Sequence, residues 1–462
     1  MTLDEVARAV GARHTTGDLG RAVGGFSIDS RTLAAGDLFV AIRGPRFDGH
    51  DFVDEALVRG ACGAIVAVGR PGGTVTAESG DARIVVQDTL GALQALARHV
   101  RRTSGTRVVA ITGSTGKTTT KEIAARVLAA RYRVFKNVGN LNNEIGLPLS
   151  LLELRHRPDV AVVELGMNHT GEIRTLVGVA EPDVRVWTNV SEAHLGFFTS
   201  VEAIADAKAE ILEQAGPEAV LVANANDARV MTRARRFAGR VCTFGIDVEA
   251  QIEATHVQDR GLDGTHAQVR IGDETLPVTV PLLGTVNLAN ALAAIAVGTC
   301  FDVPARAMVD VVGRLHAAAH RGEVVRMGRL TVIDDAYNSN PAALTAMLRS
   351  LGAMAADRRV AVIGEMLELG EASVQLHVTC GREAVAAGVD RLITIGGAPA
   401  VALGQEAVAR GLPPSAVSHV DTSAEAATLV AAEARAGDLV LVKGSRGIRT
   451  EIVVDRLREA AS

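Results

Sequence analysis

The sequence predicts an α/β protein with three domains: a mixed α/β N-terminal domain, a central domain built on a parallel sheet with a small antiparallel insertion, and a C-terminal Rossmann-like domain. Two observations point to this class. Short apolar runs alternate with helical stretches from residue 107 onward, which is typical of a parallel sheet with crossover helices. The alternation restarts at about residue 317, and 462 residues suit about three domains. We therefore expect domains at 1–104, 105–316 and 317–462.

The composition describes a globular protein and disfavours several classes. Apolar residues make up 48% of the chain, charged residues 22% and aromatic residues 3%, so we expect cores made mainly of Ala, Val and Leu. The formal net charge of −5 and the lack of a basic stripe disfavour a nucleic-acid partner. Four widely spaced cysteines predict neither a disulfide framework nor a zinc site, and they favour a reducing compartment: Cys62, Cys242, Cys300 and Cys380.

Two stretches that could meet a membrane do not fit that role. The N-terminal stretch MTLDEVARAVGA carries Asp4 and Glu5 and lacks the apolar core of a signal peptide. The most apolar window, 281–300, is interrupted by Asn287 and Asn290, so we expect a buried helix with a polar start. These features predict a cytoplasmic protein without membrane insertion.

The N-terminal region mixes short strands with helices. Apolar runs at 37–42, 63–68 and 83–86 predict strands. The stretch TSGT at 103–106 marks a joint to the next domain.

A glycine-rich joint opens the central domain. The apolar run 108–111 predicts a buried strand and 121–128 predicts a helix. Between them, glycines allow several backbone N–H groups to point at one anion at the helix N-terminus, which makes a phosphate cradle. Lys117 can then reach the β- and γ-phosphates of a nucleotide, and the Thr118 hydroxyl can bind Mg²⁺. Ile111 stands where the general P-loop pattern has its first glycine. A glycine-rich turn without a ligand is the alternative.

Three side chains follow the phosphate loop at positions suited to chemistry. Glu164 lies at the carboxyl end of the strand predicted within DVAVVELG (159–166), where a carboxylate could bind a metal ion. His194 follows the end of the next strand in the same way. Lys208 lies on an amphipathic stretch at 200–215, and its pattern alone predicts a solvated surface lysine.

The remaining sequence predicts the rest of the fold. Residues 250–281 alternate apolar and polar positions around LDGT and GDET, which indicates antiparallel hairpins. After residue 317, LTVIDDAY, RRVAVIGEM, RLITIGG and DLVLVKGSRG predict strands with helices between them. Such an arrangement places a site for a nucleotide and two substrates at domain interfaces.

Several motifs together resemble the Mur ligase family of bacterial cell-wall synthesis. They are GSTGKTTTKE, NVGNLNNEIGLPLSLL, VVELGMNHTGEI, NVSEAHLGFF, AKAEI, GTVNLANALAA and DDAYNSNP, and the resemblance includes the N-terminal DSRTLAAGDLFVAIRGPRFDGHDF. The form YNSNP at 337–341 and the absence of DNPR resemble the member that joins D-alanyl-D-alanine to UDP-N-acetylmuramoyl-tripeptide. This implies an ATP-dependent ligase that forms an acyl phosphate and makes the pentapeptide precursor of peptidoglycan. We also expect the protein to be a monomer.

The resemblance also implies roles for individual residues. The ATP site would consist of Gly113, Ser114, Thr115, Gly116, Lys117, Thr118, Thr119, Asn287, Asn290, Arg321 and Asp335. Two Mg²⁺ ions would be held by Thr118, Glu164, His194 and an N-carboxylated Lys208, and the catalytic set would be Lys117, Glu164, His194, Lys208 and Arg321. The UDP-muramoyl substrate would meet Ser30, Arg31, Asp48, His50, Asn142 and Asn143. Candidates for holding the dipeptide are Glu365, Lys443, Ser445 and Arg446, for which a plain loop role stays equally open.

The sequence departs from the family pattern at two loops. His320 precedes Arg321 where glycine is common, and AHLGFF places its glycine one position earlier than the frequent HLEGF form. Two other functions stay open: another amino-acid ligase of the Mur or folylpolyglutamate type, and a non-catalytic P-loop regulator.

Overall fold

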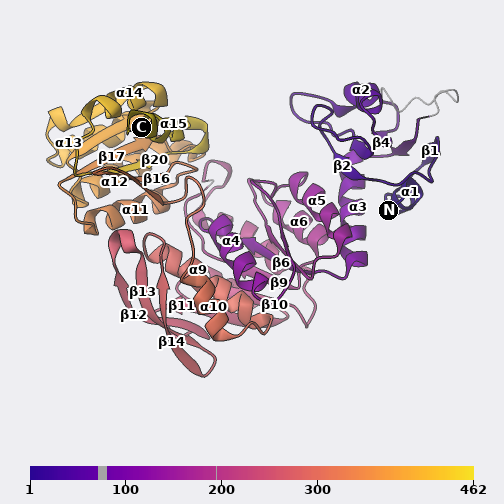
Figure 1. The fold of residues 1–462 in the computed structure, drawn as a ribbon, viewed down its shortest axis with the longest axis horizontal. Helices are drawn as coiled ribbons and strands as arrows, with labels where there is room; N and C mark the ends of the chain where they lie inside the picture. The colour runs from indigo at the N-terminus through magenta and orange to yellow at the C-terminus, as the bar shows by residue number, and fades with distance from the viewer. Residues whose placement is uncertain (71–80, 194, 462) are drawn as a thin grey trace. The chain divides into compact units, whose positions relative to one another are not determined.

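The computed structural model describes residues 1–70, 81–193 and 195–461 (Figure 1). It contains three sheets, most of whose strands are parallel, which confirms the predicted α/β class. The chain divides into two compact units. The first comprises 1–110, 132–167 and 171–183, and the second comprises 111–131, 168–170 and 184–462. The three expected domain boundaries stay a prediction.

The first unit begins with a five-stranded sheet. Its order is β1-β5-β4-β3-β2, and only β1 is antiparallel to its neighbour. The strands are β1 (His14–Thr16), β2 (Gly25–Ser27), β3 (Asp37–Val40), β4 (Gly63–Ala67) and β5 (Arg83–Val86). Two short helices belong to this part, α1 (Leu3–Ala9) and α2 (Val53–Val58). A small core that includes Phe39, Val53 and Val66 holds the sheet and α2 together.

The first unit continues with most of strand β6 (Arg107–Thr112) and with strands β8 (Val160–Glu164) and β7 (Val134–Lys136), in the order β6-β8-β7. The helices here are α3 (Thr89–Ser104), α5 (Gly146–Leu151) and α6 (Glu172–Ala180), and α3 packs against both of the others. Asp88 caps the start of α3 through two backbone N–H groups. Gly105 ends the helix at φ +73°, a conformation that glycine adopts without strain.

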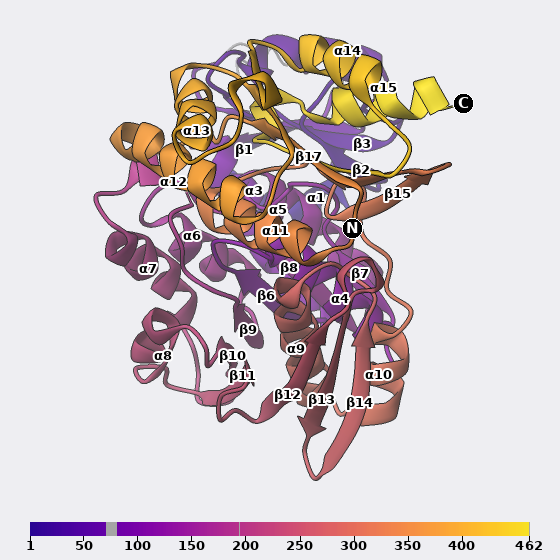
Figure 2. The same cartoon turned by 90° about the vertical axis from the view of Figure 1, so that its left-hand side faces the viewer.

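The second unit begins with six strands in the order β14-β13-β12-β11-β10-β9. They are β9 (Val184–Trp187), β10 (Val220–Asn224), β11 (Arg240–Ile246), β12 (Ile252–Asp259), β13 (Thr265–Ile271) and β14 (Glu274–Val280). Strands β12, β13 and β14 run side by side as antiparallel neighbours, as expected (Figure 2). Strand β12 also pairs in parallel with β11, so these antiparallel strands extend the main sheet.

Five helices accompany these strands: α4 (Lys117–Ala129), α7 (Val201–Ala209), α8 (Ala228–Ala234), α9 (Thr285–Cys300) and α10 (Ala305–Val312). Helix α9 is buried along most of its length and packs against α4, as its apolar sequence predicts. Helix α7 is shorter than the predicted 200–215 helix, since a 3₁₀ turn at Glu210–Leu212 follows it.

The C-terminal part of the second unit is a six-stranded sheet with helices on both faces (Figure 1). Its order is β15-β16-β20-β17-β18-β19, and all pairs except β15 with β16 are parallel, which confirms the Rossmann-like prediction. The strands are β15 (Glu323–Met327), β16 (Leu330–Asp335), β17 (Arg358–Gly364), β18 (Arg391–Ile395), β19 (Val417–Val420) and β20 (Asp438–Lys443). The helices are α11 (Pro341–Ala353), α12 (Ser373–Ala386), α13 (Ala398–Ala409), α14 (Ser423–Glu433) and α15 (Glu451–Ala461).

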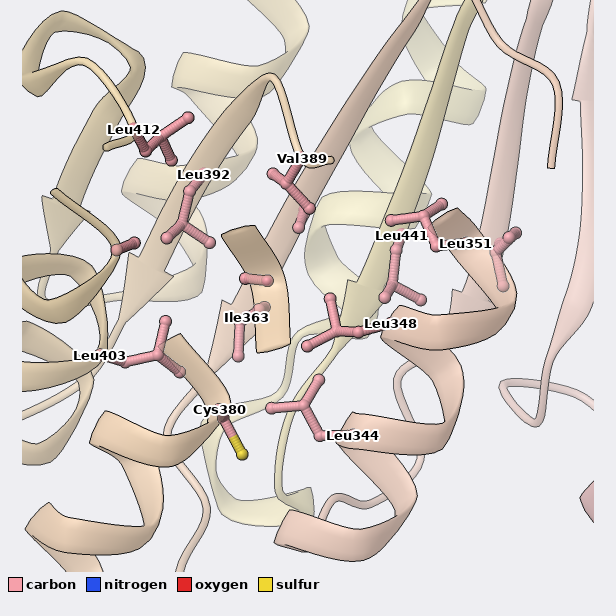
Figure 3. Packing of buried hydrophobic residues seen from close by; sticks show 14 of the residues in the cluster. Leu344, Leu348, Leu351, Ile363, Cys380, Val389, Leu392, Leu403, Leu412 and Leu441 are labelled. Atoms are coloured by element: carbon pink, nitrogen blue, oxygen red, sulfur yellow. The ribbon is translucent and has the colours of Figure 1, made fainter. Parts of the chain in front are cut away.

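Apolar side chains hold this sheet between its helix layers. On one face, Leu344 and Leu348 of α11 lie close to Cys380 of α12, Ile363 of β17 and Leu441 of β20 (Figure 3). The other face is covered by a second cluster from α14 and α15. Among the helices of the described ranges, none has the length and apolarity needed to cross a bilayer.

Candidate nucleotide and ligase site

The phosphate loop lies between the end of β6 and the start of α4, as the sequence predicts. Gly116 directly precedes the helix with φ +79°, and a Cβ there would overlap the Asn290 Oδ1 atom. A Cβ on Gly113 would overlap the Thr188 Oγ1 atom. Only glycine fits at these two positions, so the loop geometry depends on both.

Residues that follow β9 hydrogen-bond to the phosphate loop and hold it in place. The N–H of Ser114 donates to the Asn189 carbonyl at 3.0 Å, and the N–H of Thr115 donates to Asn189 Oδ1 at 2.9 Å. The N–H of Ser191 donates to Ser114 Oγ at 2.9 Å, and Thr188 Oγ1 donates to the Thr115 carbonyl at 2.8 Å. The loop is therefore preorganised by the WTNVS segment, a role that our sequence reading did not assign to it.

Two lysines converge on the loop. Lys117 Nζ donates to the Gly113 carbonyl at 2.8 Å, and Lys208 Nζ donates to the same oxygen at 3.2 Å. Lys208 has only 1% of its surface exposed. The prediction of a solvated surface lysine, which its helix pattern alone gave, is therefore wrong. Packing against the loop, and not the polarity of its own helix, determines where this side chain lies.

Arg321 reaches the same loop from the segment before β15. Its Nη2 atom donates to Thr118 Oγ1 at 3.1 Å, and its guanidinium carbon lies 3.8 Å from the centre of the Tyr337 ring. Stacking on an aromatic face holds an arginine in one orientation while its donors stay available. The structure thus joins Arg321 to the YNSNP motif and to the phosphate loop.

A pocket adjoins the loop where the resemblance implies the nucleoside. It holds about 410 Å³ of space, part of it open to solvent, and Thr119, Asn287 and Arg321 are among its lining residues. Asn290 lies deeper: Thr120 Oγ1 donates to its Oδ1 at 3.2 Å, and its Nδ2 donates to Asn287 Oδ1 at 3.1 Å. The Asn287 amide also donates to the Leu283 carbonyl at 2.8 Å, so Asn287 lines the pocket with both of its amide atoms engaged, and its role toward a base stays a prediction.

Glu164 ends β8 in the first unit, as predicted, with 4% of its surface exposed. Asn142 Nδ2 donates to Glu164 Oε1 at 2.9 Å, so Asn142 orients this carboxylate. Asn143 instead accepts from the Ile145 and Gly146 N–H groups at 3.3 and 2.8 Å. That contact anchors the start of α5.

His194 lies outside the described residues. Within the described part of the chain, no group of three His, Cys, Asp or Glu side chains forms a metal site. The implied ligand set instead combines Thr118, Glu164, His194 and Lys208, and it stays a prediction.

The candidate residues for the uridine nucleotide are held within the first unit. The His50 ring accepts the Ala67 N–H at Nε2, 2.9 Å away, and its Nδ1 lies 2.5 Å from Asp48 Oδ1. Burial opposes ionisation of Asp48, but the hydrogen bonds from His50 outweigh it and hold the pKa of this carboxyl below its usual value. Both ring nitrogens of His50 are thus engaged, so it shapes the loop and does not offer a free donor.

The other two candidates for the uridine nucleotide, Ser30 and Arg31, are neighbours in sequence but differ in exposure. Arg31 donates to both carboxylate oxygens of Asp29, at 2.9 and 2.7 Å, and this contact lowers the pKa of Asp29 to about 2. The Arg31 side chain is 80% exposed, whereas Ser30 is buried.

The dipeptide candidates gather at the carboxyl ends of the C-terminal strands. Lys443 Nζ lies 2.6 Å from Asp335 Oδ2 and also donates to the Asn338 carbonyl at 2.9 Å, so it ties β20 to the YNSNP motif. Ser445 Oγ accepts the Leu367 N–H at 2.9 Å. Lys443 and Ser445 are both buried and fix loops.

The remaining two candidates lie at the edge of this group. Glu365 Oε2 accepts the Gly397 N–H at 2.6 Å. Arg446 is exposed, and its guanidinium carbon lies 5.7 Å from the centre of the Tyr337 ring.

The displaced glycine of AHLGFF has a contact of its own. The Gly196 N–H donates to the Glu368 carbonyl at 2.7 Å, and the backbones of Gly196 and Gly370 pack closely. Glu368 adopts a left-handed conformation with φ +64°. The loop around it is anchored by His377, whose Nε2 accepts the Met366 N–H at 2.9 Å.

Comparison with known proteins matches three consecutive parts of the chain to one family. They are the Mur ligase family, catalytic domain, over 22–101, the Mur ligase middle domain over 111–298, and the Mur ligase, glutamate ligase domain over 320–446. The chain is 34% identical over 438 residues to the UDP-N-acetylmuramoyl-tripeptide–D-alanyl-D-alanine ligase of Bacillus subtilis (strain 168), covering 94% of this chain and 93% of that protein.

Two solved structures agree with this similarity. MurF from Acinetobacter baumannii matches with a TM-score of 0.88 at 29% identity, covering 99% of this chain and 98% of that one. MurF from Thermotoga maritima in complex with ADP matches with a TM-score of 0.82 at 29% identity, covering 95% and 97%. The chain belongs to the Mur ligase family. Within that family it is MurF-like, since the similarity to these ligases spans nearly its whole length.

Proposed function

We propose that this protein is an ATP-dependent ligase that joins D-alanyl-D-alanine to UDP-N-acetylmuramoyl-tripeptide and so makes the pentapeptide precursor of peptidoglycan. The observation that carries the proposal is the convergence of Lys117, Lys208 and Arg321 on one glycine-shaped phosphate loop, in a chain similar to such ligases over 94% of its length. A non-catalytic regulator would need neither a second buried lysine nor an arginine at this loop.

The reaction needs an activated carboxylate, because a free carboxylate does not react with an amine at neutral pH. The γ-phosphoryl group of ATP passes to the terminal carboxylate of the tripeptide, which releases ADP and leaves an acyl phosphate. The dipeptide amine then attacks the carbonyl carbon, and phosphate leaves as the amide bond forms. Lys117 and Arg321 offset the negative charge that gathers when carboxylate and γ-phosphate meet.

The residues present suit magnesium ions that assist this transfer. The Thr118 hydroxyl and the Glu164 carboxylate are hard oxygen ligands of the kind that Mg²⁺ prefers, and bound Mg²⁺ would neutralise phosphate charge. An ammonium group on Lys208 would repel the ion, whereas N-carboxylation of Lys208 would supply two oxygen ligands. The carbamate nitrogen keeps one N–H, which can still donate to the Gly113 carbonyl as Nζ does in the structure.

In this proposal, the dipeptide binds at the carboxyl ends of β16 and β20. Lys443 and Ser445 hold the loops that border it, and Glu365 and Arg446 are the side chains that we assign to the dipeptide itself. In the same proposal, Ser30, Arg31 and the Asp48 loop meet the uridine nucleotide, and Asn142 keeps Glu164 oriented. We propose that the enzyme acts as a monomer in the cytoplasm, where its nucleotide substrates are made.

Phosphate release by the purified protein tests the proposal. The assay contains UDP-muramoyl-tripeptide and ATP, with and without D-alanyl-D-alanine, and mass spectrometry identifies the product. We expect phosphate and pentapeptide only when the dipeptide is present, and slower ligation of D-alanine, L-lysine or D-glutamate. Equal ligation of a single amino acid would indicate another ligase of the family, and no turnover with any acceptor would indicate a regulator.

Lys117→Ala is the control variant for the phosphate-release assay. This substitution should lower kcat at least ~100-fold, because it removes the positive charge that stabilises the phosphoryl group during its transfer. Near-normal turnover of the variant would show that the loop does not act as proposed.

A further inference from the structure

His320 has a backbone conformation that histidine rarely adopts. Its φ angle is +60°, in the left-handed region, which residues with a Cβ atom adopt rarely, although asparagine, aspartate and histidine do so more often than most. Such strain persists only where the surroundings hold it, and it often marks a functional position. The residue that follows is Arg321, which contacts the phosphate loop.

Two bonds hold His320 in this conformation. Its ring Nδ1 lies 2.8 Å from Asp334 Oδ2 on β16, and its carbonyl accepts the Tyr337 N–H at 3.0 Å. Asp334 is fully buried, and burial raises the pKa of this carboxyl. Its other neighbours are the Ala336 N–H at 3.3 Å and the Arg458 guanidinium at 3.8 Å. The His320 ring is thus the close side-chain partner of a carboxylate that is costly to leave unsatisfied.

The same surroundings determine where Arg321 points. Tyr337 bonds to the His320 carbonyl through its backbone and stacks on the Arg321 guanidinium through its ring. The left-handed turn at His320 therefore places the arginine between the Tyr337 ring and Thr118 Oγ1. If the turn relaxed, the guanidinium would lose one or both of these contacts.

We propose that His320 is a positioning residue for the ligase reaction: its ring, anchored on Asp334, holds the strained turn that delivers Arg321 to the phosphate loop. The inference rests on the proposed function, because it concerns the rate of phosphoryl transfer. A glycine would adopt the same φ angle without strain but would leave the turn without its anchor.

His320→Gly separates these two contributions, since it permits the conformation and removes the ring. We expect kcat to fall about 10-fold or more, the loss typical of a hydrogen bond to a charged group, while KM for D-alanyl-D-alanine changes less than about twofold. His256→Gly is the matched control: His256 also has a left-handed φ angle, +53°, but lies on β12. It should leave kcat unchanged.

A double-mutant cycle with Arg321→Ala distinguishes positioning from general support of the fold. If His320 acts through Arg321, His320→Gly should change kcat less than about twofold in the Arg321→Ala background. Independent, multiplicative effects of the two substitutions would overturn the inference, as would wild-type kcat in His320→Gly. Should His320→Gly fail to fold, His320→Asn replaces it, because asparagine tolerates the left-handed region. A wild-type protein that makes no pentapeptide would refute the proposed function instead, before any variant is compared.

Discussion

Replacing Gly116 by alanine should destabilise the protein and weaken nucleotide binding. Gly116 has φ +79°, and a Cβ atom there would overlap Asn290 Oδ1. Asn290 is 4% exposed and hydrogen-bonds to Thr120 and Asn287, so it cannot move aside without losing those contacts.

The magnitude follows from these contacts. A residue with a Cβ atom in the left-handed region costs about 1–2 kcal/mol. Displacing Asn290 adds the loss of two hydrogen bonds at about 0.5–1.5 kcal/mol each. The free energy of unfolding should therefore fall by about 2–5 kcal/mol. Gly105→Ala serves as the control, because Gly105 has a similar φ of +73° and no heavy atom near its Cβ position. Gly105→Ala should lower the free energy of unfolding only by the about 1–2 kcal/mol of the left-handed conformation.

Chemical denaturation and titration with ADP measure the two effects. We expect Gly116→Ala to be less stable than Gly105→Ala by about 1–3 kcal/mol and to bind ADP at least ~10-fold more weakly, since the amides at the start of α4 shift. Gly105→Ala should bind ADP like the wild type. Equal stability and equal ADP affinity of the two variants would refute the reasoning. So would a Gly116→Ala, Asn290→Ala double variant whose losses simply add, because removing the Asn290 amide should relieve the overlap.

Three further outcomes are expected. Lys208→Ala should be nearly inactive, and added acetate should restore part of the rate by occupying the place of the N-carboxylate; full activity would contradict the carbamate role. Gly196→Ala should lower kcat/KM for the dipeptide about 10-fold, because the new Cβ would lie 2.9 Å from the Glu368 carbonyl and would displace the loop that follows Glu365, a residue that we assign to the dipeptide. Gly216→Ala, which meets no heavy atom within 4 Å, should not change it. Burial lowers the pKa of His377 in the folded protein, so the unfolded chain binds more protons below about pH 6.5, and the free energy of unfolding should decrease as the pH is lowered through that range. His377→Gln should reduce this fall in urea titrations, and an unchanged slope would contradict it.

Local sequence patterns predicted the elements that frame the site. The strand Arg83–Val86 has the bounds of the predicted stretch RIVV, and the loop with Gly113 and Gly116 joins β6 to α4 as expected. Such features depend on contacts within a turn or between neighbouring residues, which the order of residue types contains. The motifs were likewise sufficient to recognise the family.

The roles of single polar side chains depended on the tertiary structure. Lys208 looked like a surface residue on its own helix, yet it is buried against the phosphate loop, and Asn189, which our sequence reading did not single out, holds that loop in place. His320 stood out only as a departure from a motif, and its anchoring on Asp334 required two segments to meet. A local pattern encodes the period of a helix or strand, whereas burial and hydrogen-bond partners are set by elements far apart in the chain. The sequence by itself therefore determined the fold class, the phosphate loop and the family, and the packing of distant segments decided which side chains serve the site and which only support it.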